Sequence, residues 1–415
     1  MSTIADRISE IRSQFPALSK TVNEKAAVYL DGPAGTQVPH RVIEGIAEYL
    51  SNSNANHGGL FATSYESDQK LDDAHQAAAD FLGTADPKCV SFGPNMTTLT
   101  FALSRSLART WKSGDEIIVT RLEHDANFTP WILAARDAGV TVNYVDIDAN
   151  DCTLKLEQFE QFLNDRTKLV AVGCASNATG TVNPVAKICR WARDVGAHSF
   201  LDAVHYAPHD LIDVEEFGCD FLICSAYKFF GPHIGIQYGK RELLESLEAY
   251  KLRPADDSLP SKWMTGTQNH ECLHGTTQAI DYLADLGRNE SNQPEDRRAA
   301  LRAAYKLIRE YEDELANHLL DELEKINGLK IWGITDPANR SNRLPTVSIT
   351  HERASPEGIA KRLSDDAIFV WHGNYYALPL TERLGVEPDG MVRIGLVHYN
   401  THDEIDRLIA VLRSM

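Results

Sequence analysis

Long apolar runs are missing from this chain of 415 residues. No stretch approaches the ~18 apolar residues that span a bilayer, and the first residues lack the apolar core of a signal peptide. Basic residues are outnumbered, with 41 Lys and Arg against 59 Asp and Glu, and the formal charge of −18 is spread along the chain. Nucleic acids and anionic membranes favour clustered Lys and Arg. We therefore expect neither as a partner.

Cysteines are few and unpatterned. The seven stand at positions 89, 152, 174, 189, 219, 224 and 272, without the paired spacing of a metal site. An odd, scattered set in a long chain is typical of reduced thiols, so we expect a cytoplasmic protein with no metal centre. The chain also lacks the Gly-x4-Gly-Lys-Ser/Thr loop and any strand-linked Gly-x-Gly-x-x-Gly, so nucleoside triphosphate and dinucleotide binding are not supported.

Short apolar segments alternate with helical patterns in the middle of the chain. The alternation predicts a largely parallel sheet covered by helices on both faces, with ligands beyond the carboxyl ends of the strands. The predicted strands are 116–120, 140–147, 168–173, 198–202 and 220–224, and the predicted helices are 128–138, 154–163 and 185–195.

The rest of the chain predicts a second, smaller α/β unit. We expect residues 31–280 to form a large ligand-binding domain and 281–415 a small C-terminal α/β domain. Residues 1–30, with an amphipathic segment at 4–15, are expected to pack on the small domain. In the C-terminal part we predict a long helical region from about 279 to 326 with a break at 289–294, strands at 329–334, 347–350, 368–371 and 391–397, and helices at 356–364 and 402–413.

A lysine and an aspartate end two of the predicted strands. Lys228 follows the apolar segment 220–224 and precedes a Gly-Pro pair, and Asp202 closes the segment 198–202. Pyridoxal phosphate (PLP) chemistry needs an amine for a Schiff base and an anion for the pyridinium nitrogen. Taken separately, the lysine could simply extend its amine to solvent at a strand end, and the aspartate could cap a turn. As a pair on neighbouring strands they favour a cofactor site.

Other polar residues follow the strand ends. His124 could stack its flat ring on a planar cofactor, or it could simply be a solvated histidine in a loop. Asn177 could donate its amide to a ring hydroxyl, or it could form an Asx turn before Gly180. Asn95, Met96 and Thr97 open an apolar helix, whose N-terminus suits a phosphate.

Arg393 is one charge inside an apolar strand. It is either paired with an internal acid or placed to bind a carboxylate ligand, since either satisfies a desolvated charge.

Together these motifs resemble a fold type I PLP enzyme of the class V aminotransferase family, on its cysteine desulfurase/selenocysteine lyase branch. The similarity runs nearly from end to end, through seven motifs in the right order. They are Tyr29–Ala34, Glu123–Asn127, Ser176–Gly180, Asp202–His205, Ser225–Lys228, Gly266–Asn269, and Arg393 with Tyr399–His402.

The resemblance implies a role for each matching position. Lys228 would hold the cofactor and move the Cα proton, Asp202 would keep the pyridine nitrogen protonated, and His124 would stack on the ring. Asn177 would contact the ring 3-oxygen, and the phosphate and ring edge would be held by Asn95, Met96, Thr97, Ser225 and His205. In a homodimer, Thr267 would reach the phosphate of the other subunit's site. Arg393 would bind the substrate α-carboxylate, and His57 would line the substrate mouth.

One departure concerns sulfur. Desulfurases carry a mobile cysteine shortly before the position of Arg393, whereas here Tyr376 stands there and no cysteine lies beyond 272. A phenol cannot accept sulfur. Cys224 is expected to be buried packing, and Cys272, the one other thiol near the proposed site, is expected to be structural.

We therefore predict a PLP enzyme acting on an α-amino acid, by transamination or β-elimination without a protein persulfide. Desulfuration through another thiol, epimerisation, and a non-catalytic PLP-fold protein are the alternatives. The substrate stays open.

Overall fold

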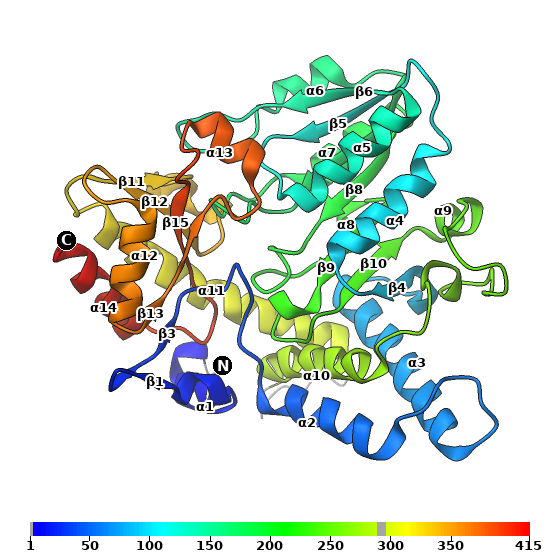
Figure 1. Ribbon diagram of the computed structural model, residues 1–415, viewed down its shortest axis with the longest axis horizontal. Coiled ribbons are helices and arrows are strands. Elements are labelled where there is room, and N and C mark those ends of the chain that lie inside the picture. Colours follow the sequence, from blue (N-terminus) through cyan, green and yellow to red (C-terminus); the bar gives the residue numbers. More distant parts are fainter. Residues whose placement is uncertain (1–2, 289–295) are drawn as a thin grey trace.

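A seven-stranded sheet forms the larger part of the protein, whose computed structural model describes residues 3–288 and 296–415 (Figure 1). The strand order is β4-β10-β9-β8-β7-β5-β6, and β10 runs antiparallel to both of its neighbours while the other pairs are parallel. The bounds are β4 Val90–Gly93, β5 Glu116–Thr120, β6 Thr141–Val145, β7 Thr167–Gly173, β8 His198–Asp202, β9 Phe221–Ser225 and β10 Gly235–Gly239. The predicted α/β fold with a mostly parallel sheet is confirmed.

Both faces of this sheet are buried because its central strands are apolar on both sides. Ile117 and Val119 pack into the cluster that includes α4 (Met96–Ala108) and α5 (Thr129–Ala138), whereas Ile118 packs into the larger cluster with α7 (Val185–Asp194). Successive side chains of a strand point to opposite faces, so one apolar run supplies both layers. The carboxyl ends of β7, β8 and β9 are left for polar residues.

A second, antiparallel sheet has the order β11-β12-β15-β14. Beside it, the N-terminal strand β3 pairs in parallel with β13, and the backbone N–H of Gly395 in β15 donates to the Leu30 carbonyl over 2.8 Å. The chain's first and last parts therefore share hydrogen bonds. The bounds are β3 Val28–Tyr29, β11 Leu329–Trp332, β12 Thr346–His351, β13 Ile368–Phe369, β14 Trp371–Gly373 and β15 Met391–Gly395, with a separate hairpin of β1 Thr21–Val22 and β2 Lys25–Ala26.

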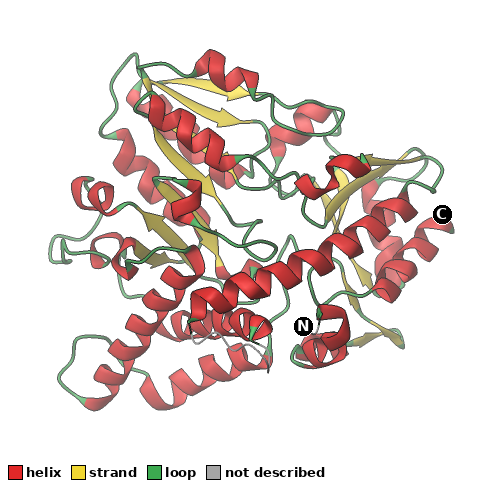
Figure 2. Cartoon of the chain, turned by 180° about the vertical axis from the view of Figure 1, so that it is seen from behind, coloured by secondary structure: helices red, strands yellow, loops and turns green. Residues whose placement is uncertain are grey.

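Long helices join the two sheets. Seen from behind, α11 (Arg297–Leu323) crosses the molecule from the large sheet to the small one (Figure 2). Helix α10 starts at His270, earlier than the predicted 279, because Asn269 caps it by accepting the Cys272 N–H over 3.0 Å. The remaining helices are α1 Ile4–Ser13, α2 His40–Glu48, α3 Ala62–Leu82, α6 Glu157–Phe162, α8 Val214–Phe217, α9 Arg241–Ser246, α10 His270–Gly287, α12 Pro356–Asp365, α13 Leu378–Leu384 and α14 His402–Arg413.

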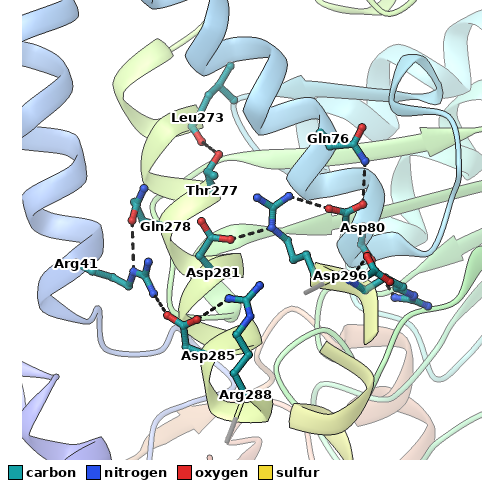
Figure 3. A network of polar contacts seen from close by, with 12 residues as sticks. Arg41, Gln76, Asp80, Leu273, Thr277, Gln278, Asp281, Asp285, Arg288 and Asp296 are labelled. Carbon is teal, nitrogen blue, oxygen red and sulfur yellow. Dashed lines mark hydrogen bonds and ion pairs between the residues drawn. The ribbon is translucent and has the colours of Figure 1, made fainter. Parts of the chain in front are cut away.

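Ion pairs tie α10 to its neighbours (Figure 3). Arg297, at the start of α11, donates to Asp80 on α3 over 2.7 Å and to Asp281 on α10 over 2.8 Å. Arg41 on α2 reaches Asp285 on α10. The predicted break at 289–294 lies outside the described residues, and the predicted domain boundaries stay a prediction. Among the described helices, none is long and apolar enough to cross a membrane.

Candidate active site

One cavity lies at the carboxyl ends of β7, β8 and β9, facing the N-terminus of α4. Nine of the predicted site residues line it together, from four strand ends and one helix start. They are Asn95, Met96, Thr97, His124, Asn177, Asp202, His205, Ser225 and Lys228. A wider outer part shares Thr97, His124, Asn177 and Lys228 and adds Arg393, Tyr376 and the segment 371–375.

Lys228 is the buried amine of this cavity. It ends the short 3-10 turn Ala226–Lys228 after β9, where its Nζ donates to the Pro33 carbonyl and lies 4.7 Å from the centroid of the Tyr227 ring. Burial, aided by the positive charge of Arg393, lowers the pKa of Lys228 to about 7. A substantial fraction of the amine is therefore neutral near pH 7, as a nucleophile requires.

Asp202 ends β8, the strand next to β9, so its carboxylate and the Lys228 amine enter one cavity from adjacent strands. Its Oδ1 accepts the Val204 N–H over 2.9 Å. Burial raises the pKa of Asp202 to about 6 although that bond and Lys228 favour the anion. A buried carboxylate with spare acceptor capacity suits a cationic N–H partner.

A second buried carboxyl, Glu123, was not predicted as a site residue although it lines the same cavity. It accepts hydrogen bonds from the Thr120 hydroxyl (2.7 Å), the Gly173 N–H (3.0 Å) and the Asn127 amide (2.6 Å). Burial nevertheless raises the pKa of Glu123 to about 7, with a further increase from the charge of Asp202. Its place beside His124 in sequence was the available signal.

His124 lies beneath the loop that carries Tyr376. Its Nδ1 accepts the Ala126 N–H over 3.0 Å, and burial lowers the pKa of His124 to about 3, so the ring is neutral. The Tyr376 ring stacks on it at 5.7 Å between centroids and 28° between planes, and the Tyr376 carbonyl accepts the Asp125 N–H over 2.6 Å. Tyr375 and Tyr376 both have left-handed backbone, with φ of 56° and 58°. These contacts hold the loop in a conformation that costs free energy.

Arg393 meets Asn177 at the inner edge of this loop. The Arg393 Nη1 donates to the Asn177 carbonyl over 2.9 Å, and its guanidinium lies 4.3 Å from the centroid of the Tyr375 ring. The Asn177 amide donates to the Tyr375 carbonyl over 3.0 Å. Within the described part of the chain, no carboxylate lies within ion-pair distance of Arg393, which favours the carboxylate-ligand interpretation over an internal salt bridge. Tyr375 is a further site residue that the sequence did not single out.

The N-terminus of α4 forms another wall. Asn95 caps it by accepting the Thr98 N–H over 2.9 Å, and the Met96 N–H donates to the Ser225 hydroxyl over 3.1 Å. Thr97, between them, is exposed and lines the cavity. A helix N-terminus with one residue turned to a cavity is an anion site.

His205 closes the far side. Its Nε2 lies 3.0 Å from the Thr346 hydroxyl of β12, and burial lowers the pKa of His205 well below its usual value. The small sheet thereby contacts the cavity wall.

Two predicted residues lie elsewhere in the single chain. His57 is exposed and its ring is 6.2 Å from that of His270, whereas Thr267 is exposed in the loop before α10. Neither lines the cavity. Their roles, which involve a second chain for Thr267, stay predictions.

An independent observation is consistent with a polar ligand such as a phosphate-bearing pyridine in this cavity. Two polar atoms of its wall, the Asn177 Oδ1 and the His205 Nδ1, are buried without a hydrogen-bond partner among the described residues. Buried polar atoms in native structures normally have partners, so this wall is built to contact a polar molecule.

Comparison with known proteins decides the family. The model of the family described as "Aminotransferase class-V" matches residues 28–408. The chain belongs to the class-V aminotransferases. This family uses PLP, and the fold type I architecture expected from the sequence is confirmed.

Several known proteins resemble this chain over nearly its whole length. A probable cysteine desulfurase of Halalkalibacterium halodurans is 32% identical over 413 residues, covering 96% of this chain and 95% of that protein. The aminotransferase-like protein FGM3 of Gibberella zeae is 33% identical over 427 residues and covers 100% of both. Among solved structures, the apo cysteine desulfurase of Thermococcus onnurineus NA1 has a TM-score of 0.86 at 25% identity, covering 98% of this chain and 97% of the other.

The thiols of this class-V chain are not part of the cavity wall. Of the seven cysteines, all within the described residues, six are buried, Cys272 is half-buried, and none lines either part of the cavity. Burial raises the pKa of Cys272 and of Cys224, which disfavours the thiolate in both.

Proposed function

We propose that this class-V aminotransferase family member is a PLP-dependent enzyme that acts on the amino group of an α-amino acid. The observation that carries the proposal is the Lys228 amine and the Asp202 carboxylate at adjacent strand ends in one cavity. PLP, when bound, supplies an electron sink for the bond broken at Cα.

The chain's own residues have separate tasks in this proposal. The Lys228 Nζ would attach the cofactor and afterwards carry the proton removed from Cα, since its pKa of about 7 suits both proton uptake and release. Asp202 would hold the proton of the pyridine nitrogen. The ring would lie under His124, with Asn177 at its 3-oxygen.

The cofactor phosphate and the substrate carboxylate would be held by different parts of the site. Thr97 at the α4 N-terminus, Ser225 at the end of β9, and His205 would contact the phosphate and ring edge. Arg393 would bind the substrate carboxylate. We also propose a homodimer in which Thr267 reaches the partner's phosphate, with His57 at the substrate mouth.

We propose transamination or β-elimination as the reaction, without a protein persulfide. Tyr376 stacks over His124 where the resemblance places a sulfur-accepting cysteine, and a phenol cannot take that role. The relatives named cysteine desulfurase favour a second candidate, desulfuration through another thiol. The raised pKa and the position of Cys272 weigh against it.

Cofactor binding is tested first. Purified protein is mixed with PLP, treated with borohydride and digested, and the peptide carrying the cofactor is identified by mass spectrometry. We expect modification of Lys228 and a visible absorption band that Lys228→Ala lacks. A protein that stays colourless and unmodified with excess PLP would refute the enzyme proposal, including the Lys228 assignment.

The reaction is tested next with the holoenzyme and single amino acids. Release of pyridoxamine phosphate would indicate transamination, and release of pyruvate or another 2-keto acid with ammonia would indicate elimination. Racemisation of the substrate would indicate an epimerase. Persulfide on any of the seven cysteines after treatment with cysteine would overturn the exclusion of a protein persulfide.

A further inference from the structure

Asp31 is a half-buried acid beside the site, and the proposed reaction assigns it no role. It follows β3, and it pairs in a parallel bridge with Gly395 at the end of β15. Paired residues of neighbouring strands place their side chains on the same face of the sheet, as do alternate residues of one strand. The side chains of Asp31 and of Arg393, two residues before Gly395, are therefore on the same face. Asp31 and Arg393 thus come from neighbouring backbone segments.

The close approach of these segments depends on Gly395. A Cβ added there would lie 2.0 Å from Pro33 Cδ, so a side chain at 395 would push the segment away from β15. Two residues after Asp31, the Pro33 carbonyl accepts a hydrogen bond from the Lys228 amine. One short segment therefore touches both the lysine and the strand of the arginine.

The charges at this point are uneven. Arg393 is a buried cation, Lys228 is a buried amine whose pKa is lowered to about 7, and Asp202 is the acid assigned to the cofactor nitrogen. Asp31 is the acid that acts on both basic groups: each lowers the pKa of Asp31, and the charge of Asp31 favours the protonated form of each. Its Oδ1 is buried with no hydrogen-bond partner within the described residues.

We propose that Asp31 is a positioning residue that balances the charge of Arg393 while no carboxylate ligand is bound, and that it takes up a proton when a substrate carboxylate binds beside Arg393. The inference rests on the proposed role of Arg393 and adds a proton to the binding step. A second anion beside a buried carboxylate disfavours its charge, and protonation removes the repulsion.

The groups that face Asp31 determine the pH range in which carboxylate binding should take up a proton. Burial raises the pKa of Asp31 to about 6, so it is mostly charged at pH 7. Tyr29 and Tyr399, whose pKa values are raised in part by Asp31, stay neutral there. Arg393 supplies the opposing positive charge in the holoenzyme, where Lys228 is attached to the cofactor. Carboxylate binding should therefore take up between about 0.5 and 0.9 proton at pH 7 and close to none at pH 5.

The test is calorimetric titration of the holoenzyme with propionate, which has the carboxylate but no amine to compete with Lys228. Binding heats in two buffers of different ionisation enthalpy give the number of protons taken up. For the wild type we expect the uptake stated above, and an affinity that falls by up to about tenfold per pH unit above pH 6. Asp31→Asn should bind propionate without proton uptake, and more tightly than the wild type at pH 8.

The control variant is Asp313→Asn, which removes another partly buried acid with a raised pKa, paired with Arg309 on α11. It should keep the wild-type proton uptake. Proton uptake that persists in Asp31→Asn would assign the proton to another group, such as Asp202, and overturn the inference. If Asp31→Asn does not fold, equal uptake by the wild type at pH 5 and pH 7 overturns it instead.

The failures of the two proposals are distinguishable. Propionate that binds the wild type but not Arg393→Met, with no proton uptake at either pH, leaves the Arg393 role standing and refutes the role of Asp31. Propionate that binds neither protein, or both equally, refutes the Arg393 role and with it this inference.

Discussion

Replacing Glu123 by Gln should change how the stability of the protein depends on pH. The pKa of Glu123 in the folded chain is about 7 against an ordinary value of 4.5. The folded state therefore binds more protons than the unfolded state between these two values, and stability falls as pH rises through that range. The difference of about 2.5 pKa units corresponds to about 3–4 kcal/mol, at about 1.4 kcal/mol per unit.

The variant has a cost of its own that does not depend on pH. Glu123 accepts three hydrogen bonds, and the amide of a glutamine presents a donor either to Asn127 or to the Gly173 N–H. A buried donor without an acceptor costs about 1–3 kcal/mol. Protonated Glu123 avoids this mismatch because it can donate to the Thr120 hydroxyl.

The two terms together predict a crossing. At pH 5 the Glu123→Gln variant should be less stable than the wild type by about 1–3 kcal/mol, and at pH 8 the two should be nearly equal or reversed. Urea unfolding of the cofactor-free proteins at equal concentration, at four pH values between 5 and 8, measures the difference. Glu160→Gln, on an exposed position of α6, is the control and should show no such trend.

A difference between wild type and Glu123→Gln that stays constant from pH 5 to pH 8 would refute this reasoning. It would mean that the three hydrogen bonds keep Glu123 ionised throughout, so that burial does not dominate its titration.

Two further substitutions test the frame around the site. Tyr376→Gly relieves about 1 kcal/mol of left-handed backbone strain and loses a ring contact of similar energy, so the unfolding midpoint should barely move. His124 should become more reactive to diethyl pyrocarbonate because its ring is uncovered, and unchanged reactivity would contradict the stacking. Arg297→Met leaves Asp80 on α3 and Asp281 on α10 without their shared cation, so the free energy of unfolding should fall by about 2 kcal/mol, and by less in high salt. Equal losses at low and high salt would contradict an electrostatic origin.

The sequence predicted the parallel core well because its strands are buried on both faces and read as continuous apolar runs. It missed β4 and β10. Strand β4 has four residues, too few to show an alternating pattern of apolar side chains. Strand β10 begins and ends with glycine, a residue that weakens strands and therefore argues against one. Helix α10 was predicted to start late because its first turn is polar.

The site was predictable where chemistry sits at strand ends, as for Lys228 and Asp202. It was not predictable where a role depends on a distant backbone. Glu123 is a site residue because Gly173 approaches it, and Asp31 because Gly395 lets a remote segment lie beside β15. The position of Glu123 beside His124 in the sequence is a hint, but no local pattern predicts these two contacts themselves, since both are made by backbone groups of remote segments.

The pairing of the first strand with the C-terminal sheet has a consequence for how the protein is made. Asn400 donates to the Tyr29 carbonyl across 371 residues of sequence, and the Pro33 carbonyl that meets Lys228 belongs to the same segment. During synthesis the early strand must wait for β13 and β15 to leave the ribosome before it can dock. A nascent chain thus holds Lys228 without its final surroundings until these later strands have emerged and the early segment has docked on them.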